Sequence, residues 1–223
     1  MIVEQLEDNF ENIPFEEQAK YGPINSFFLT VTMLIRTPGG FFNQLHINKG
    51  VKMPLLFLLI ILAFSNTINY IYISSNIIDS PSKQIITAME SDPELKPQAD
   101  NLRSLFSKES KATDILFSII SNFILIYLVA LYWHLILKSL QIALNGFEAT
   151  LRVFCYSSVV LLTSFIPLST PFLNFAIYIW WSFLMFIGIS EAHEVSKKLA
   201  LRGMTISLFA TMIPFIFFVL LIF

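Results

Sequence analysis

Acidic and histidine side chains gather where a long apolar run ends near residue 190. Glu191, His193 and Glu194 directly follow the run WWSFLMFIGIS. A zinc protease motif needs two histidines four residues apart on one helix, with a glutamate as the base. Lys197 stands where the second histidine would be, and a protonated lysine repels a cation. The spacing therefore excludes this type of zinc site.

Two interpretations of this cluster stay open. In the first, Glu191, His193 and Glu194 contribute to a looser polar site with groups from other helices. In the second, a helix leaves the membrane here and its charges are solvated or paired locally. Glu194 precedes Lys197 and Lys198 by three and four residues, which is the spacing of ion pairs on a helix surface.

A second polar group lies at the end of another apolar run. His134 and Lys138 are four residues apart and share one helix face. Aromatic and cationic side chains at this level commonly anchor a helix in the headgroup region. Alternatively, they meet Glu191 or His193 across a helix bundle and form a polar pocket for a lipid phosphate or a proton. The predicted cytoplasmic polar cluster is His134, Lys138, Glu191, His193 and Glu194.

Small and hydroxyl side chains follow Cys155 in the segment VFCYSSVVLL. Such residues let helices approach closely and form hydrogen bonds between or within helices. They predict interhelix packing or a narrow polar path, whose residues are Tyr156, Ser157, Ser158, Pro167, Asn174 and Gly188. An intramembrane hydrolase that uses Cys155 or His193 is a further alternative, although no spacing brings the two together.

Motifs that bind cofactors or perform covalent catalysis are missing from the sequence. It contains no Walker loop, no Rossmann glycine set, no Gly-x-Ser-x-Gly and no pair of acidic residues deep in an apolar run. Ion-coupled transporters usually keep an ionisable group near the middle of the membrane. We therefore predict no catalytic residue, no metal and no cofactor, and the remaining transport hypothesis is a passive lipid or small-solute translocator.

The composition indicates that most of the chain faces lipid. Of 223 residues, 55% are hydrophobic and 13% charged, against about 25% charged in soluble domains. The mean hydropathy is +0.68 and the net charge is -2, which argues against nucleic acid as a partner. The acidic start of the chain lacks the pattern of a secretory signal, so we expect an internal span to direct insertion.

Five apolar stretches are long enough to be membrane spans, and they predict an all-α integral membrane bundle. The expected spans cover about residues 53–78, 115–137, 151–166, 172–190 and 204–223. Pro167 and Pro171 predict a tight hairpin between the third and fourth spans, and Arg202-Gly203 a separation before the fifth. With the N-terminus in the cytoplasm, nine Lys and Arg residues lie inside and five outside. This count predicts a cytoplasmic N-terminus and an outside C-terminus.

Two segments are expected outside the membrane core. Residues 1–52 combine an acidic tail with short amphipathic helices, of which NSFFLTVTMLIR lies along the interface or packs on the bundle. The loop 79–114 is expected to hold short helices near Ser82–Met89 and Ala99–Phe106. Residues 53–223 then form one five-helix transmembrane domain.

The order of these features resembles the Yip family of five-span membrane proteins, which interact with Ypt/Rab small GTPases, and its prokaryotic branch in particular. The most specific parts are Tyr156-Ser157-Ser158, Pro167 and the segment from Gly188 to Ala200. The resemblance implies a non-enzymatic multi-pass protein that scaffolds protein partners or organises membrane lipid. Eukaryotic members act in vesicle trafficking and carry a long cytoplasmic region, whereas only about 50 residues precede the first span here.

The partners and the location follow from the same resemblance and from the composition. The expected partners are membrane lipids and either a second copy of the chain or another membrane protein. A bacterial inner membrane is the expected location, because the chain is compact and rich in Ile, Asn and Lys.

Overall fold

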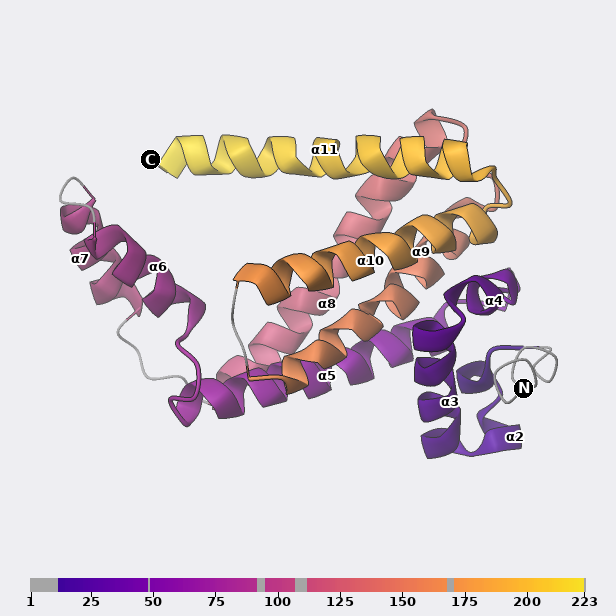
Figure 1. Cartoon of the computed structure of the whole chain (residues 1–223), viewed down its shortest axis with the longest axis horizontal. Coiled ribbons are helices and arrows are strands. Elements are labelled where there is room, and N and C mark those ends of the chain that lie inside the picture. Colours follow the sequence, from indigo (N-terminus) through magenta and orange to yellow (C-terminus); the bar gives the residue numbers. More distant parts are fainter. Residues whose placement is uncertain (1–11, 48, 92–94, 107–111, 168–170, 223) are drawn as a thin grey trace.

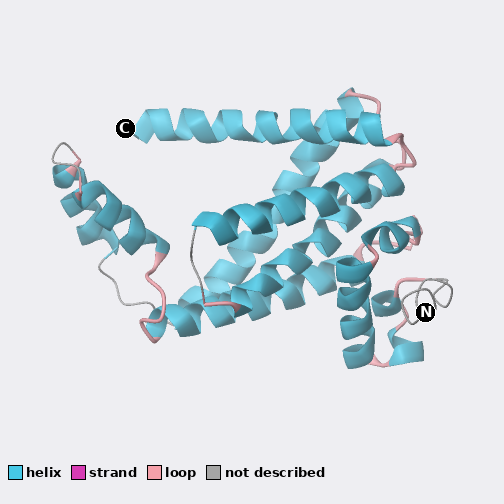
Figure 2. Ribbon diagram, in the orientation of Figure 1, coloured by secondary structure: helices cyan, strands magenta, loops and turns pink. Residues whose placement is uncertain are grey.

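The computed structural model describes residues 12–222, apart from 48, 92–94, 107–111 and 168–170. Every regular element in these residues is helical (Figures 1 and 2), as the composition predicts. Within them, three helices are long and apolar enough to cross a membrane. They are α5 (Lys52–Ser74), α8 (Ala112–Ser139) and α10 (Pro171–Ala192).

The three helices leave many large apolar side chains exposed. On α8 these include Leu116, Phe117, Leu125 and Leu128. In water such a surface would be strongly unfavourable, whereas hydrocarbon solvates it at no cost. Together with their length, this exposure identifies the chain as an integral membrane protein.

The third expected span is built from two shorter elements. Helix α9 covers Gly146–Ser157, and the 3₁₀ helix η2 continues over Ser158–Phe165. Ser158 Oγ donates to the carbonyl of Cys155 at 2.6 Å, and Thr163 Oγ1 donates to that of Val160 at 2.6 Å. Hydroxyls that bond to carbonyls three residues back compete with the α-helical pattern. The expected hairpin residues 168–170 lie outside the described residues, and a count of five spans stays a prediction.

The expected separation at Arg202-Gly203 is wrong. Helix α11 runs without a break from Lys197 to Ile222, and the chain turns earlier, because Glu194 adopts a left-handed conformation with φ of 53°. Val195 N–H donates to Ser190 O at 3.0 Å and Glu194 N–H to Glu191 O at 3.2 Å. This is the Schellman pattern that ends a helix, so Glu191 and Glu194 do not share one helix face.

Four short elements form the N-terminal part, in the order η1 (Pro14–Glu16), α2 (Gln18–Tyr21), α3 (Pro23–Arg36) and α4 (Pro38–Asn43). They lie at the end of the bundle where α5 begins, and α3 runs crosswise to α5, α10 and α11 (Figure 1). Phe15 is 1% exposed, and its N–H donates to Thr30 Oγ1 at 3.0 Å. The end of the predicted acidic tail is therefore part of the folded core.

The two short helices expected in the loop 79–114 are confirmed as α6 (Pro81–Glu90) and α7 (Lys96–Phe106). They pack on each other through Ile86, Met89 and Ala99, which form a core of their own. An ion pair between Arg103 and Glu90 joins the two helices. In Figure 1 this pair stands apart from the rest of the bundle.

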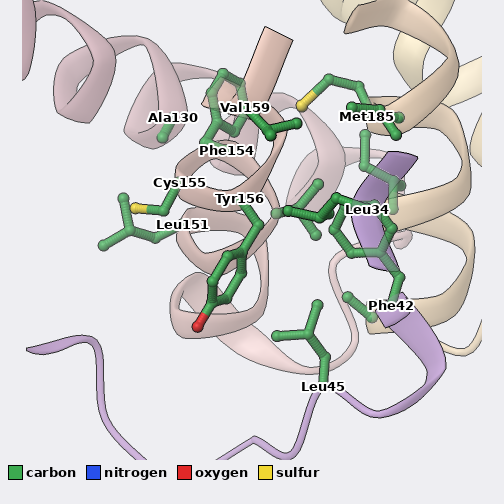
Figure 3. Packing of buried hydrophobic residues seen from close by; sticks show 14 of the residues in the cluster. Leu34, Phe42, Leu45, Ala130, Leu151, Phe154, Cys155, Tyr156, Val159 and Met185 are labelled. Carbon is green, nitrogen blue, oxygen red and sulfur yellow. The ribbon is translucent and has the colours of Figure 1, made fainter. Parts of the chain in front are cut away.

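The main core lies between α9, the N-terminal elements and the long helices. Figure 3 shows Phe154, Tyr156 and Val159 of α9 and η2 among Leu34, Phe42 and Met185. A Cβ on Gly188 would lie 2.5 Å from Val153 Cγ1 and 3.1 Å from Phe42 Cε1. Gly188 therefore permits α10 to approach α9 and α4 more closely than any side chain would.

Candidate functional site

A buried charged network lies where α9 meets the N-terminal segment. Arg152 is 0% exposed, and its Nη2 pairs with a carboxylate oxygen of Glu16. Its Nη1 donates to the carbonyl of Gly50 at 2.9 Å and to Glu148 Oε1 at 3.3 Å. Tyr156 Oη donates to the same Glu16 oxygen at 2.6 Å. We call Glu16, Gly50, Glu148, Arg152 and Tyr156 the arginine clamp.

The local sequence explains how the arginine clamp forms. Glu148 and Arg152 are one helical turn apart on α9, and the Gly50 N–H donates to Glu148 Oε1 at 3.0 Å. The planar guanidinium can bind several acceptors at once, so Arg152 reaches η1, the segment before α5 and its own helix. A buried cation without partners would be very unfavourable, and here two carboxylates compensate it.

Aromatic rings shield the arginine clamp. The Tyr156 ring contacts Phe41 edge to face at a centroid distance of 5.0 Å and Phe57 at 5.2 Å. The ring of Phe15, the residue before Glu16, contacts the ring of Phe57 at a centroid distance of 5.3 Å. The rings cover the side of the arginine clamp where Arg152 is 0% and Glu16 8% exposed, and low exposure to water strengthens the polar bonds there. The arginine clamp therefore fixes the N-terminal segment to the bundle.

A second buried group joins two histidines through one hydroxyl. Thr150 Oγ1 lies 3.0 Å from His134 Nδ1 and 3.0 Å from His193 Nε2, while the Asn145 N–H donates to His193 Nδ1 at 3.3 Å. Because His193 Nδ1 accepts, neutral His193 carries its proton on Nε2 and donates to Thr150. The Thr150 hydroxyl is then directed at His134 Nδ1. The bonds form a directed chain from Asn145 to His134.

This histidine pair holds three elements together. His134 belongs to α8, Thr150 to α9 and His193 to the turn after α10. His193 and Thr150 are both 0% exposed. Burial, and then the nearby His134, lower the pKa of His193 to about 4, so His193 is neutral at physiological pH. The hydroxyl resembles a nucleophile beside a base, but its full burial leaves no surface for a substrate.

The other members of the predicted cytoplasmic polar cluster lie outside this pair. Lys138 and Glu194 are exposed and Glu191 is half-buried. Across the residues that the structure describes, no ion pair involves these three side chains, and no group of three or more His, Cys, Asp or Glu residues is arranged for a metal ion. Of the predicted cytoplasmic polar cluster, the structure thus brings together His134 and His193, whereas Lys138, Glu191 and Glu194 do not join them.

The residues of the predicted packing set divide between two places. Tyr156, Ser157 and Ser158 are buried, and a Cβ on Gly188 would meet Val153 of α9, the helix that carries Tyr156 and Ser157. Pro167, two residues after the end of η2, and Asn174, in the first turn of α10, are exposed. A role of these six residues in interhelix packing or in a polar path stays a prediction.

Sequence reasoning missed the partners of both buried groups, which are Glu16, Glu148, Thr150 and Asn145. One sequence feature could have indicated the partners of Arg152 in the arginine clamp. Arg152 lies inside the expected third span, where a cation needs a buried counter-ion. Acidic residues with apolar neighbours are the candidates for that counter-ion: Glu148 in GFEATLR and those of the segment NIPFEE, which contains Glu16.

An apolar cavity of about 240 Å³ lies between α8, α9, η2 and α10. Its lining includes Leu125, Val129, Phe154, Ser158 and Trp181. It has the size and character of a site for part of a hydrocarbon chain.

The pattern of the Yip1 domain matches residues 32–220 of the chain. This match covers α4 to α10 entirely and α11 up to residue 220. It includes His134, Thr150 and His193, and all of the arginine clamp except Glu16. No curated protein and no solved structure matches the chain.

Proposed function

The chain belongs to the Yip1 domain family, and from this premise we propose that it is a non-enzymatic five-span scaffold that organises membrane lipid and holds protein partners. The proposal includes the prokaryotic branch, a bacterial inner membrane, a cytoplasmic N-terminus and an outside C-terminus. The distribution of Lys and Arg supports this orientation.

One observation carries the proposal: the buried polar side chains of the two groups are used in bonds within the chain, and only Nε of the Arg152 guanidinium has no hydrogen-bond partner among their described buried atoms. Arg152 binds three other parts of the arginine clamp, and Thr150 is placed between two histidines. An active site needs reactive atoms that a substrate can approach. Buried groups that instead connect distant segments support a scaffold whose exposed surfaces bind lipids and protein partners.

The scaffold is tested by purifying the full chain in lipid nanodiscs formed directly from its membrane and identifying the retained lipids and proteins by mass spectrometry. We expect Glu16→Gln to alter the retained set, because it weakens attachment of the N-terminal segment. Glu90→Gln is the matched control, since it breaks an ion pair on α6 and α7. Recovery of a lone monomer without lipid would contradict the proposal.

The non-enzymatic part has a separate test. If Cys155→Ala and His193→Ala both leave the cellular phenotype of the chain unchanged, a hydrolase that uses either residue is excluded. Loss of the phenotype with normal folding in either variant would contradict the non-enzymatic assignment.

A passive lipid translocator is the second candidate, and the apolar cavity beside Ser158 favours it. A scrambling assay in liposomes with a fluorescent phospholipid distinguishes the two functions. Translocation above that of empty liposomes, and reduced by Val129→Trp in the cavity wall, would support transport. Rates equal to those of empty liposomes would exclude it.

A further inference from the structure

Helix α3 exposes an apolar stripe on one side. Ile24, Phe28 and Ile35 are 70%, 62% and 54% exposed, and their spacing of four and seven residues places them on one helix face. The opposite side carries the buried residues Ser26, Thr30 and Met33. Helix α3 therefore has one face in the core and another that covers nothing within the described part of the chain.

The stripe lies beside the lipid-facing surface of α5. Phe27, adjacent to the stripe, contacts Phe57 of α5 at a centroid distance of 5.4 Å. Phe57 is five residues into α5, or about 7.5 Å from its start. At the same level α5 exposes Leu56, Leu59 and Ile60. The stripe thus continues the apolar surface of a membrane-spanning helix near the end of that helix.

The direction of α3 also fits a position at the membrane surface. It runs crosswise to α5, α10 and α11 (Figure 1), so it lies along the membrane plane when those helices cross the bilayer. Lys20 precedes the helix and Arg36 ends it, and both side chains are exposed. Cationic side chains at the ends of an interfacial helix extend toward the headgroups.

A groove of about 460 Å³ between α2 and α3 borders the stripe. Its lining is Lys20, Tyr21, Asn25, Phe28, Leu29 and Thr32. The Lys20 side chain is 61% exposed, and its ammonium lies 3.8 Å from Glu17 Oε2 and 5.0 Å from the centre of the Tyr21 ring. A surface ion pair of this length is weak, and the ammonium, phenol and amide groups of this lining can all donate hydrogen bonds. These are suitable donors for a phosphate, and Phe28 belongs to both the groove and the stripe.

We propose that α3 is an interfacial helix that binds phospholipid. Its stripe rests on acyl chains, and the groove between α2 and α3 holds the phosphate of one phospholipid through Lys20. The continuity with α5 and the cations at both ends favour lipid over a protein partner. The proposal does not depend on the scaffold function, because a translocator with the same α3 would bind lipid in the same way.

The depth of the stripe can be measured with nitroxide labels in phosphatidylcholine–phosphatidylglycerol vesicles. Cys155 is the single cysteine and is buried, so Cys155→Ser provides the background. Labels at Ile24→Cys, Phe28→Cys and Ile35→Cys should be accessible to oxygen and protected from a water-soluble nickel complex. A label at Arg36→Cys should show the reverse. Stripe labels that the nickel complex reaches as easily as the control would overturn the proposal.

The same labels distinguish a protein occupant. If a second copy covered the stripe, the labels would be protected from both oxygen and nickel and would show dipolar broadening between copies. That outcome would also overturn the proposal.

The groove is tested with a phospholipid that carries a photoactivatable group beside its phosphate. In the same vesicles we expect Lys20→Gln to lower crosslinking to α2 and α3 about fivefold, which corresponds to one cation near the headgroups. Lys83→Gln is the matched control, because Lys83 of α6 is 65% exposed and pairs with Asp79, much as Lys20 is 61% exposed and pairs with Glu17. Equal crosslinking in wild type and Lys20→Gln would remove the phosphate site.

Discussion

The arginine clamp predicts a strong energetic coupling between Glu16 and Arg152. Arg152→Met leaves the Glu16 carboxylate, which is 8% exposed, without its cation. Removing one partner of a buried pair costs about 3–5 kcal/mol. Glu16→Gln keeps an acceptor for Tyr156 but removes the charge, so we expect a smaller cost of about 2–3 kcal/mol.

The double variant separates this coupling from general damage. Glu16→Gln with Arg152→Met leaves no uncompensated charge between the two positions, and replacement of a whole buried pair by neutral groups is often close to neutral. We therefore expect the double variant to be about 3 kcal/mol more stable than the sum of the two single effects predicts.

Amide hydrogen exchange measures the effect where the arginine clamp acts. The Phe15 N–H, which donates to Thr30 Oγ1 at 3.0 Å, exchanges only when η1 detaches from α3. A loss of about 3 kcal/mol in the free energy of this opening accelerates exchange about 150-fold. Amides of α6, far from the arginine clamp, serve as the internal control and should not change.

Two results would refute this reasoning. One is additivity, in which the double variant exchanges at the rate that the two single effects predict together. The other is acceleration of the α6 amides to the same extent, which would show global unfolding and not detachment of η1.

Two further predictions concern the histidine pair and the close helix contact. Burial and His134 lower the pKa of His193 to about 4 from 6.5, so the unfolded chain takes up the proton first as the pH falls. Between pH 6.5 and pH 4, the free energy of unfolding of the wild type should decrease by up to about 3 kcal/mol relative to that of His193→Gln, as measured in mixed micelles. Parallel pH profiles of the two proteins would contradict this. Gly188→Ala should lower stability by about 1–3 kcal/mol in the same assay, because its Cβ would meet the short, branched Val153. Gly39→Ala, with nothing within 4 Å of its Cβ, should be near neutral, and equal effects of the two changes would refute the packing argument.

The membrane spans were the part of the fold that the sequence predicted best, because they depend on hydrophobicity and length alone. The spans near 53–78, 115–137 and 172–190 correspond to α5, α8 and α10, because hydrocarbon requires long apolar helices whatever their neighbours are. The helices of the loop 79–114 also followed from local pattern and proline positions.

The helix ends were harder to predict. The turn after α10 has Glu194 in a left-handed conformation, where glycine is usual, so the sequence offered Arg202-Gly203 as the more obvious break. Gly203 instead lies inside α11, where an added Cβ would be 2.5 Å from Ile142 Cδ1. A glycine that permits close packing and a glycine that ends a helix look identical in a single sequence.

The buried partnerships depended on contacts between distant segments. Glu16 belongs to the expected acidic tail, and only the fold places it beside Arg152. His134 and His193 were both candidates for a polar pocket, but Thr150, which lies between them, carried no distinguishing pattern. Sequence periodicity assigns side chains to faces of one helix and cannot identify which faces meet.

The distance along the chain between Glu16 and Arg152 has a consequence for biosynthesis. Their positions differ by 136 residues, which a ribosome takes about 7–27 s to translate. Until α9 emerges, Glu16 has no guanidinium to meet, and a nascent chain that stops short of α9 keeps an unattached end. The bond that fixes the N-terminal segment to the bundle therefore forms only after the chain has been synthesised through α9.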